Sequence, residues 1–124
     1  MGSIEHLPRS HTLRDHRAHD HRFEELRRAY YARIGRDRAR LAKLSAELAQ
    51  AEANALPVFE DIRMLAHRMG GAAAIFEAIE IGNAAITLEH AAIAAIDARA
   101  NNADASVWSA LENLVDLLLR TTKG

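Results

Sequence analysis

The stretch that decides the fold is LPVFEDIRMLAHRMGGAAAIF, residues 56–76. Its apolar residues recur at the spacing of an α-helix that buries one face. Proline is tolerated in the first turn of a helix, so Pro57 places the start of this helix near Leu56. The predicted buried stripe consists of Val58, Phe59, Ile62, Leu65, Ala66, Met69, Ala73 and Phe76.

A longer helix is predicted before this stretch, from Phe23 onward. Gly35 interrupts its pattern and is a candidate for a kink or a break. The apolar stripe of this helix consists of Phe23, Leu26, Tyr30, Ile34, Leu41, Leu44 and Leu48.

Two more helices are predicted after residue 76. The first covers about residues 78–100, and it must contact neighbours on two sides because its polar residues form one narrow line: Glu80, Asn83, Thr87, His90 and Asp97. The segment Asn101–Asp104 is then a turn with a candidate N-cap. The last helix carries Val107, Trp108, Leu111, Leu114, Val115 and Leu118.

The composition favours helices alone. Hydrophobic residues make up 49% of the chain and aromatic residues only 5%, with alanine dominant among the apolar residues; alanine is the best helix former. Four amphipathic helices with short connections predict an all-α, up-down-up-down antiparallel four-helix bundle over residues 22–124. Residues 1–21 lack an apolar period and are predicted as a mobile, His/Arg-rich tail. A monomer is expected, because each helix face finds a neighbour within the bundle.

The charges are divided unevenly along the chain. Residues 1–44 carry a net charge of +5 and residues 45–124 carry −6, which together give −1. The arginines of the first part alternate with acids and with the apolar stripe, which favours a solvated helix face over a nucleic-acid interface. The absence of cysteine excludes disulfides, and no apolar run reaches the roughly 18 residues that span a bilayer. A cytoplasmic protein without a membrane or nucleic-acid partner is expected.

His67 lies on the outer side of the helix predicted over residues 56–76. Counted from Ile62 at about 100° per residue, it falls about 140° from the centre of the buried face. Gly70 and Gly71 follow at the positions that stack next to His67 on a helix, although each glycine costs about 1 kcal/mol relative to alanine. We interpret them as clearance for another protein to approach the imidazole. The alternatives are an idle surface histidine and a helix end at the two glycines.

Two arginines flank His67. Arg63 lies one turn earlier on the same face, and Arg68 is adjacent in the sequence. A phosphorylated imidazole is dianionic near neutral pH, and a guanidinium can donate charge-assisted hydrogen bonds to it. Arg63 and Arg68 are therefore candidate phosphate-supporting residues. The alternative for Arg63 is an ordinary helix charge that is paired with Glu60 or Glu77.

The stretch Ala66-His67-Arg68-Met69-Gly70-Gly71-Ala72-Ala73 resembles the phosphoacceptor motif of histidine-containing phosphotransfer (HPt) domains. Ile81 and the pair Leu88–Glu89 lie where that family has apolar residues and a Leu–Glu pair on the next helix. The resemblance covers about residues 22–120, and the family's order of helices agrees with the predicted bundle.

The resemblance implies that His67 is the phosphorylated histidine and Gly71 the clearance glycine. Two residues depart from the family's pattern. Gly70 stands in place of the usual lysine, and Glu77 stands in place of a frequent glycine at the turn into the next helix. The first departure removes one positive charge from the site, for which Arg63 or Arg68 would compensate.

The resemblance also implies a phosphorelay. His67 would take a phosphoryl group from an aspartate of a response-regulator receiver domain or of a hybrid histidine kinase, and would pass it to another receiver. The receiver would supply Mg²⁺, so this chain is expected to bind no cofactor. It has no Gly-rich loop for ATP, which favours a phosphocarrier over an autonomous enzyme. A shallow docking surface would be formed by Met64, Gly70, Gly71 and Ala74.

Two other functions remain as alternatives. The first is a helical interaction module that binds a receiver domain or a partner helix without being phosphorylated. Gly70 in place of the usual lysine favours this alternative. The second is a metal or redox bundle, but the acid adjoins the histidine in Ile86–His90, unlike the Glu-x-x-His spacing of di-iron bundles. No metal ligands are predicted, because the tail histidines lack a rigid scaffold; these are His11, His16, His19 and His21.

Overall fold

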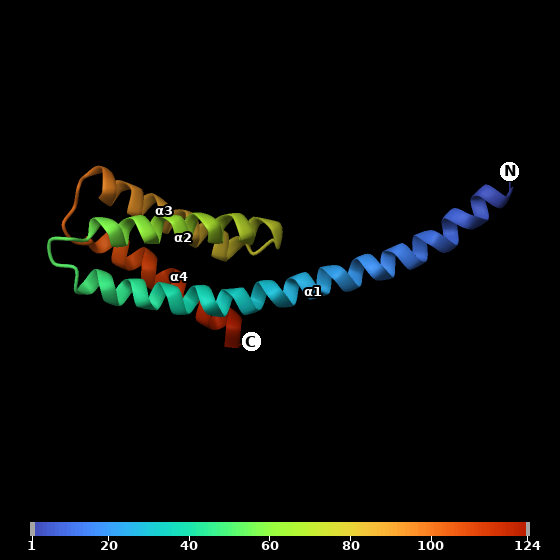
Figure 1. Cartoon of the computed structure of the whole chain (residues 1–124), viewed down its shortest axis with the longest axis horizontal. Coiled ribbons are helices and arrows are strands. Elements are labelled where there is room, and N and C mark those ends of the chain that lie inside the picture. The colour runs from blue at the N-terminus through green and yellow to red at the C-terminus, as the bar shows by residue number, and fades with distance from the viewer. Residues whose placement is uncertain (1, 124) are drawn as a thin grey trace. The chain divides into compact units, whose positions relative to one another are not determined.

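Within the described part of the chain, the secondary structure consists of helices. The computed structural model describes residues 2–123, with side chains described for residues 20–122. The helices are α1 (Gly2–Ala49), α2 (Leu56–Ile75), α3 (Ile79–Asp97) and α4 (Ala105–Lys123), as Figure 1 shows. The predicted all-α class is confirmed, and α2 begins where Pro57 placed it.

The chain divides into two compact units, Met1–Ala32 and Arg33–Gly124. In the first unit, the ring centroids of Tyr30 and Tyr31 lie 5.6 Å apart. Phe23 and Leu26, with which the predicted apolar stripe of the long helix begins, lie within this helix and are 44% and 56% exposed.

α1 begins at Gly2, so this helix includes nearly all of residues 1–21, in which the sequence shows no apolar period. Arginine, leucine and alanine are good helix formers even without a buried stripe. The predicted tail falls mostly on residues 1–19, which lie outside the residues with described side chains, and its mobility and its boundary after residue 21 stay predictions. Further along, α1 runs through Gly35 without a break.

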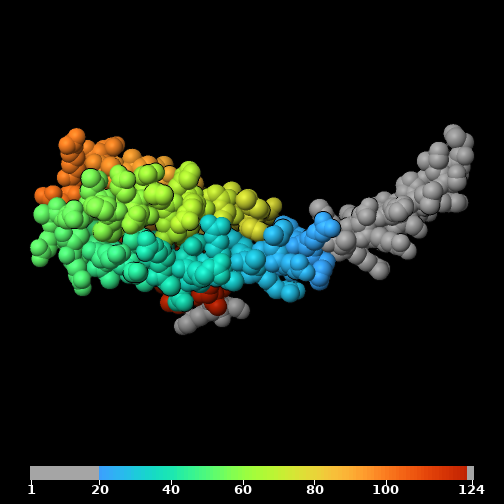
Figure 2. Space-filling view, viewed as in Figure 1, coloured from blue at the N-terminus to red at the C-terminus, as the bar shows by residue number. Residues whose placement is uncertain are grey.

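The second unit is an up-down bundle of residues 33–49 of α1 with α2, α3 and α4. α3 packs against both α2 and α4, which confirms that it has neighbours on two sides. The Arg40 guanidinium and the Asp61 carboxylate lie 3.9 Å apart and connect α1 to α2, and these two helices lie side by side in Figure 2. The largest fully buried side chains are Phe59, Ile34, Leu41, Leu44, Ile62, Leu88, Leu111, Leu114, Leu118 and Val107.

Each turn between helices contains a non-glycine residue with a left-handed backbone: Glu52 (φ 54°), Glu77 (φ 56°) and Arg99 (φ 53°). At the end of α2, the Ala78 N–H donates to the Ala73 carbonyl at 2.9 Å. This bond closes the helix around a left-handed residue, a position that glycine usually occupies. The turn from α2 into α3 is therefore short and well defined, with Glu77 at its centre.

Asp104 caps α4. Its Oδ1 accepts hydrogen bonds from the Ser106 hydroxyl at 2.6 Å, the Ser106 N–H at 3.0 Å and the Val107 N–H at 3.2 Å. These donors, the Ser106 hydroxyl foremost, hold the pKa of the Asp104 carboxyl below its usual value. The N-cap predicted within the segment Asn101–Asp104 is confirmed, and Asp104 is the residue that provides it.

α2 and α3 approach each other closely because small residues line their junction. A Cβ atom added to Gly82 would lie 3.4 Å from the Cβ of Ala73. α3 is also the one helix, among the described residues, that is long and apolar enough to cross a membrane. Within this stretch 28% is buried inside the protein, and the buried residues of α3 are Ile81, Gly82, Ala84, Ala85, Leu88 and Ala92.

Candidate functional site

The predicted site is centred on the outer face of α2. The inner face of this helix buries Phe59, Ile62, Leu65, Ala66, Met69 and Ala73, which is the predicted stripe except for its two ends. The His67 side chain points away from that stripe and is 73% exposed. The helical period therefore located His67 correctly, on a surface that a second protein can reach.

Glu89 of α3 lies against the His67 ring. The Nδ1 atom of His67 and Oε2 of Glu89 are 2.9 Å apart, and the Glu89 side chain is only 18% exposed. A carboxylate in its ionised form can only accept hydrogen bonds, so we assign the proton at this contact to Nδ1 of the ring. In a neutral imidazole with its proton on Nδ1, the lone pair is on Nε2. The contact thus fixes the orientation of the ring and leaves Nε2 as the nucleophilic nitrogen.

Sequence reasoning missed the role of Glu89. The pair Leu88–Glu89 was noted only as part of a family resemblance, without a function for the acid. One signal was available: Glu89 lies off the narrow polar line of α3, so its carboxylate must be partly covered by a neighbouring helix. An acid in that position needs a hydrogen-bond donor, and His67 is the donor that the fold supplies.

Gly70 and Gly71 have different surroundings, although the sequence treated them as a pair. α2 runs continuously through both glycines, as predicted, so they do not end the helix. A Cβ atom added to Gly70 would meet Ile86 Cγ1 at 3.7 Å, whereas one added to Gly71 would meet nothing within 4 Å. Gly70 therefore belongs to the α2–α3 junction, and Gly71 borders open space beside the imidazole.

Arg68 is exposed on α2, and its charge acts on Asp37 of α1. Burial raises the pKa of the Asp37 carboxyl, while the charges of Arg33, Arg68 and Arg36 act on it in the opposite direction. Asp37 also forms an ion pair with Arg33 at 3.7 Å. The predicted phosphate-supporting residue Arg68 is thus within electrostatic reach of an acid on α1.

Arg63 remains one turn before His67 and is partly exposed. The ion pairs found among residues 20–122 do not join Arg63 to Glu60 or to Glu77, which were its alternative partners. Its guanidinium is accordingly available to a group bound at the outer face of α2.

A groove lies next to His67, between α2 and α3. The α2–α3 groove has a volume of about 390 Å³, and its lining includes Gly70, Ala74, Glu77, Ile79, Gly82 and Ile86. Of the predicted docking residues, Gly70 and Ala74 line this groove. Met64 does not line it, and its side chain is 54% exposed. The predicted shallow docking surface is therefore partly a recess.

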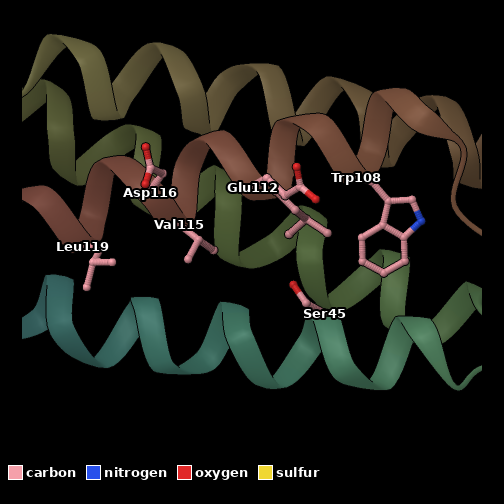
Figure 3. Close-up of a pocket in the computed structure, with 7 residues that line it drawn as sticks. Ser45, Trp108, Glu112, Val115, Asp116 and Leu119 are labelled. Atoms are coloured by element: carbon pink, nitrogen blue, oxygen red, sulfur yellow. The ribbon is translucent and has the colours of Figure 1, made fainter.

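A second groove of about 310 Å³ lies between α1 and α4, as Figure 3 shows. Trp108, Val115 and Leu119 extend from α4 towards α1, where the small Ser45 leaves room. The lining holds acids but neither a histidine nor a cation, so it offers no nucleophile or phosphate-binding group.

Among residues 20–122, the other histidines form no comparable site. His90 is exposed on α3, and His21 pairs with Glu25 at 3.0 Å. No group of three His, Cys, Asp or Glu side chains that could hold a metal ion occurs among the residues whose side chains are described. His11, His16 and His19 lie outside those residues.

Comparisons with known proteins add no relative to this picture. No protein-family model, no curated protein and no solved structure matches the chain. The structure shows a four-helix all-α domain with an exposed histidine on its second helix, whose ring contacts Glu89.

Proposed function

We propose that this protein is a histidine phosphotransfer (HPt) protein, which carries a phosphoryl group on His67 between receiver-domain aspartates. One observation supports this proposal above the others: an exposed imidazole has its Nδ1 held by a partly buried carboxylate, at 2.9 Å. A merely exposed histidine needs no such partner. The resemblance of residues 66–73 to the HPt phosphoacceptor motif supports the same conclusion.

The chemistry of the step follows from the ring. The Nε2 lone pair of His67 attacks the phosphorus of an aspartyl phosphate on the receiver domain. The new N–P bond forms as the bond from phosphorus to the acyl oxygen breaks, and the aspartate leaves with that electron pair as a carboxylate. The ring gains positive charge while Nδ1 keeps its proton, and the Glu89 carboxylate stabilises that charge. The reverse sequence delivers the phosphoryl group to the next receiver.

The surroundings of His67 have separate tasks in this proposal. The open space at Gly71 allows the receiver's phosphorylated loop to reach Nε2. Arg63 is the nearest candidate on the same face to hydrogen-bond the phosphoryl oxygens, and Arg68 adds positive charge at longer range. The receiver domain supplies Mg²⁺. The protein works in the cytoplasm as a monomer, with response-regulator receivers or a hybrid histidine kinase as its partners.

The alternative is an interaction module that binds a receiver domain without accepting its phosphoryl group. Gly70 in place of a lysine favours this alternative, since it removes a cation from the site. The two functions differ in one observable, which is a covalent change at His67.

The experiment uses the full chain and the receiver domains of its source organism, each phosphorylated with acetyl phosphate and Mg²⁺. We expect an acid-labile gain of one phosphoryl group in the wild type, which intact-mass spectrometry detects, and its complete loss in His67→Gln. His90→Gln is the matched control and should accept the phosphoryl group normally. Glu89→Gln should accept it about tenfold more slowly, because one charge-assisted hydrogen bond that orients and stabilises the ring is weakened.

The proposal is wrong if His67→Gln still takes up the label, or if no receiver labels the wild type. A receiver that binds the unlabelled wild type would then support the interaction module. Circular dichroism of each variant checks that the helices are intact.

A further inference from the structure

Two neighbouring contacts join α2 to α3 at the candidate site. In the first, His67 Nδ1 and Glu89 Oε2 lie 2.9 Å apart. In the second, Ile86 Cγ1 lies 3.7 Å from the position that a Cβ atom of residue 70 would take. Gly70 is three residues from His67 on α2, and the two contacting residues of α3 have the same spacing. Residues at this spacing are neighbours on one face of a helix, so the two contacts are adjacent.

The contact between Ile86 and Gly70 is stiff on both sides. Isoleucine inside a helix is confined to essentially one χ1 rotamer, because its Cβ atom is branched. Glycine has no side chain that could move aside, and Ala85 Cβ lies 4.0 Å from the same point beside Gly70. Ile86 therefore keeps a fixed separation between the two helices, which a long flexible side chain would not keep.

The contact between His67 and Glu89 depends on that separation. A hydrogen bond weakens outside a narrow range of distance and angle. The His67 side chain is 73% exposed, so water can replace the carboxylate if the helices move apart. The Glu89 carboxylate cannot follow freely, because its side chain is only 18% exposed and is held by its neighbours. A small displacement of α3 would thus release the ring.

We propose that Ile86 is a positioning residue of the candidate site. By packing at Gly70, it holds α3 at the distance at which the Glu89 carboxylate keeps the proton of the His67 ring on Nδ1. This inference rests on the proposed function for its consequence in phosphoryl transfer, but the state of the ring is measurable without a partner. It also gives Gly70 an internal use, because a side chain larger than a methyl group there would displace Ile86 and change the register of α3.

The test measures the His67 ring in the full, unphosphorylated chain at a pH where the imidazole is neutral. The ¹⁵N chemical shifts of its two nitrogens give the ratio of the Nδ1–H form to the Nε2–H form. Glu89→Ala should lower this ratio about tenfold, because a charge-assisted hydrogen bond favours the form that donates it. Ile86→Ala should lower it about threefold, because the bond is weakened and not removed.

Two isoleucine variants are the controls. Ile86→Val retains the branched Cβ atom and the Cγ1 atom, and it should keep the wild-type ratio. Ile79→Ala should keep it too. Ile79 is an exposed isoleucine of the same helix and lines the same groove, but it lies about two helical turns before Ile86.

A double-mutant cycle shows whether Ile86 acts through Glu89. Ile86→Ala should leave the ratio unchanged when Glu89→Ala is already present, because no carboxylate remains to be positioned. The same cycle applies to the rate of phosphoryl transfer from the receiver domains used above. Ile86→Ala alone should slow transfer about threefold, and it should add no further loss to Glu89→Ala.

The space at Gly70 is tested by two substitutions of different size. Gly70→Ala should keep the ratio, since its Cβ atom would make an ordinary contact at 3.7 Å. Gly70→Leu should lower the ratio about threefold, because the larger side chain displaces Ile86. Circular dichroism should show unchanged helicity in each variant. If Ile86→Ala lost helicity, the two Gly70 variants would decide the question in its place.

The inference is overturned if Ile86→Ala keeps the wild-type ratio, or if it lowers the ratio equally with and without the Glu89 carboxylate. Either result leaves the proposed function intact. If no receiver phosphorylates the wild type, the proposed function fails, and the ring ratio still shows whether Ile86 positions His67.

Discussion

The junction of α2 with α3 and the inner face of α4 are built from different kinds of residue. Small side chains meet at the first, where Gly82 faces Ala73 and Gly70 lies beside Ile86. Leucines dominate the second, where Leu111, Leu114 and Leu118 are fully buried. Large side chains bury more apolar surface and so stabilise the bundle more. Small ones let two helices approach, and that approach brings the His67 ring to the Glu89 carboxylate.

The difference suggests a division of tasks within one small domain. The leucine-rich face is expected to contribute more to the stability of the fold than the small-residue junction does. The small-residue junction contributes less apolar burial, but it determines the geometry of the candidate site. Substitutions in the two regions should therefore affect different measurements.

The largest expected effect is on stability, in the leucine-rich region. Leu114→Ala should lower the free energy of unfolding by about 2–5 kcal/mol, because it leaves a cavity at a fully buried position. Urea unfolding measures the loss. The same change at Leu56, which is 47% exposed, should cost less than about 1 kcal/mol. Equal losses at the two positions would show that α4 does not hold the core.

A smaller effect on stability is expected at the small-residue junction. Gly82→Val should lower the free energy of unfolding by about 1–3 kcal/mol, because a Cβ at this position already touches Ala73 at 3.4 Å and leaves no room for two further methyl groups. It should also separate α2 from α3 and weaken the contact between His67 and Glu89. The ¹⁵N chemical shifts of the His67 ring report that contact, and shifts identical to the wild type would mean that close helix packing is not what positions the ring.

Gly71→Ala should separate stability from function. The added methyl group meets open space, so the substitution should raise the free energy of unfolding by about 0.5–1 kcal/mol, the difference between glycine and alanine inside a helix. It should slow phosphoryl transfer to His67 by narrowing the approach to the ring. Faster or unchanged transfer in this more stable variant would contradict the clearance interpretation.

The smallest expected effect concerns pH and the start of α4. The pKa of Asp104 is lowered in the folded state, chiefly by the Ser106 hydroxyl, so the carboxylate stabilises the fold above its unfolded pKa of 3.8. This contribution is lost as the pH falls through the lower, folded pKa. Asp104→Ala should therefore destabilise the protein more at pH 7 than at pH 2.5 in urea unfolding, and a difference that grows on acidification would refute the cap.

The features that depend on one helix alone could be predicted from the sequence. The helical repeat of 3.6 residues determines which side chains share a face of such a helix. The spacing of Phe59, Ile62, Leu65 and Met69 was enough to place His67 on the outer face of α2. The pattern also predicted a turn with an N-cap within Asn101–Asp104, and the structure identifies Asp104 as the capping residue.

The contacts between helices could not be predicted in this way. The pairing of Glu89 with His67 depends on the register of α3 against α2, and so does the position of Gly70 beside Ile86. The electrostatic influence of Arg68 on Asp37 likewise depends on how α1 lies along α2. A helical period contains no information on register, which is set by the packing of several side chains at once.

The three left-handed residues at the turns have a practical consequence for protein engineering. A residue with a side chain is disfavoured in this conformation by about 1–2 kcal/mol, a penalty that glycine does not carry. Glu52 and Arg99 occupy such positions without lining the groove beside His67. Glycine at these two joints is therefore a route to a more heat-resistant scaffold, whereas the same change at Glu77 would also remove an acid from the lining of the groove beside His67.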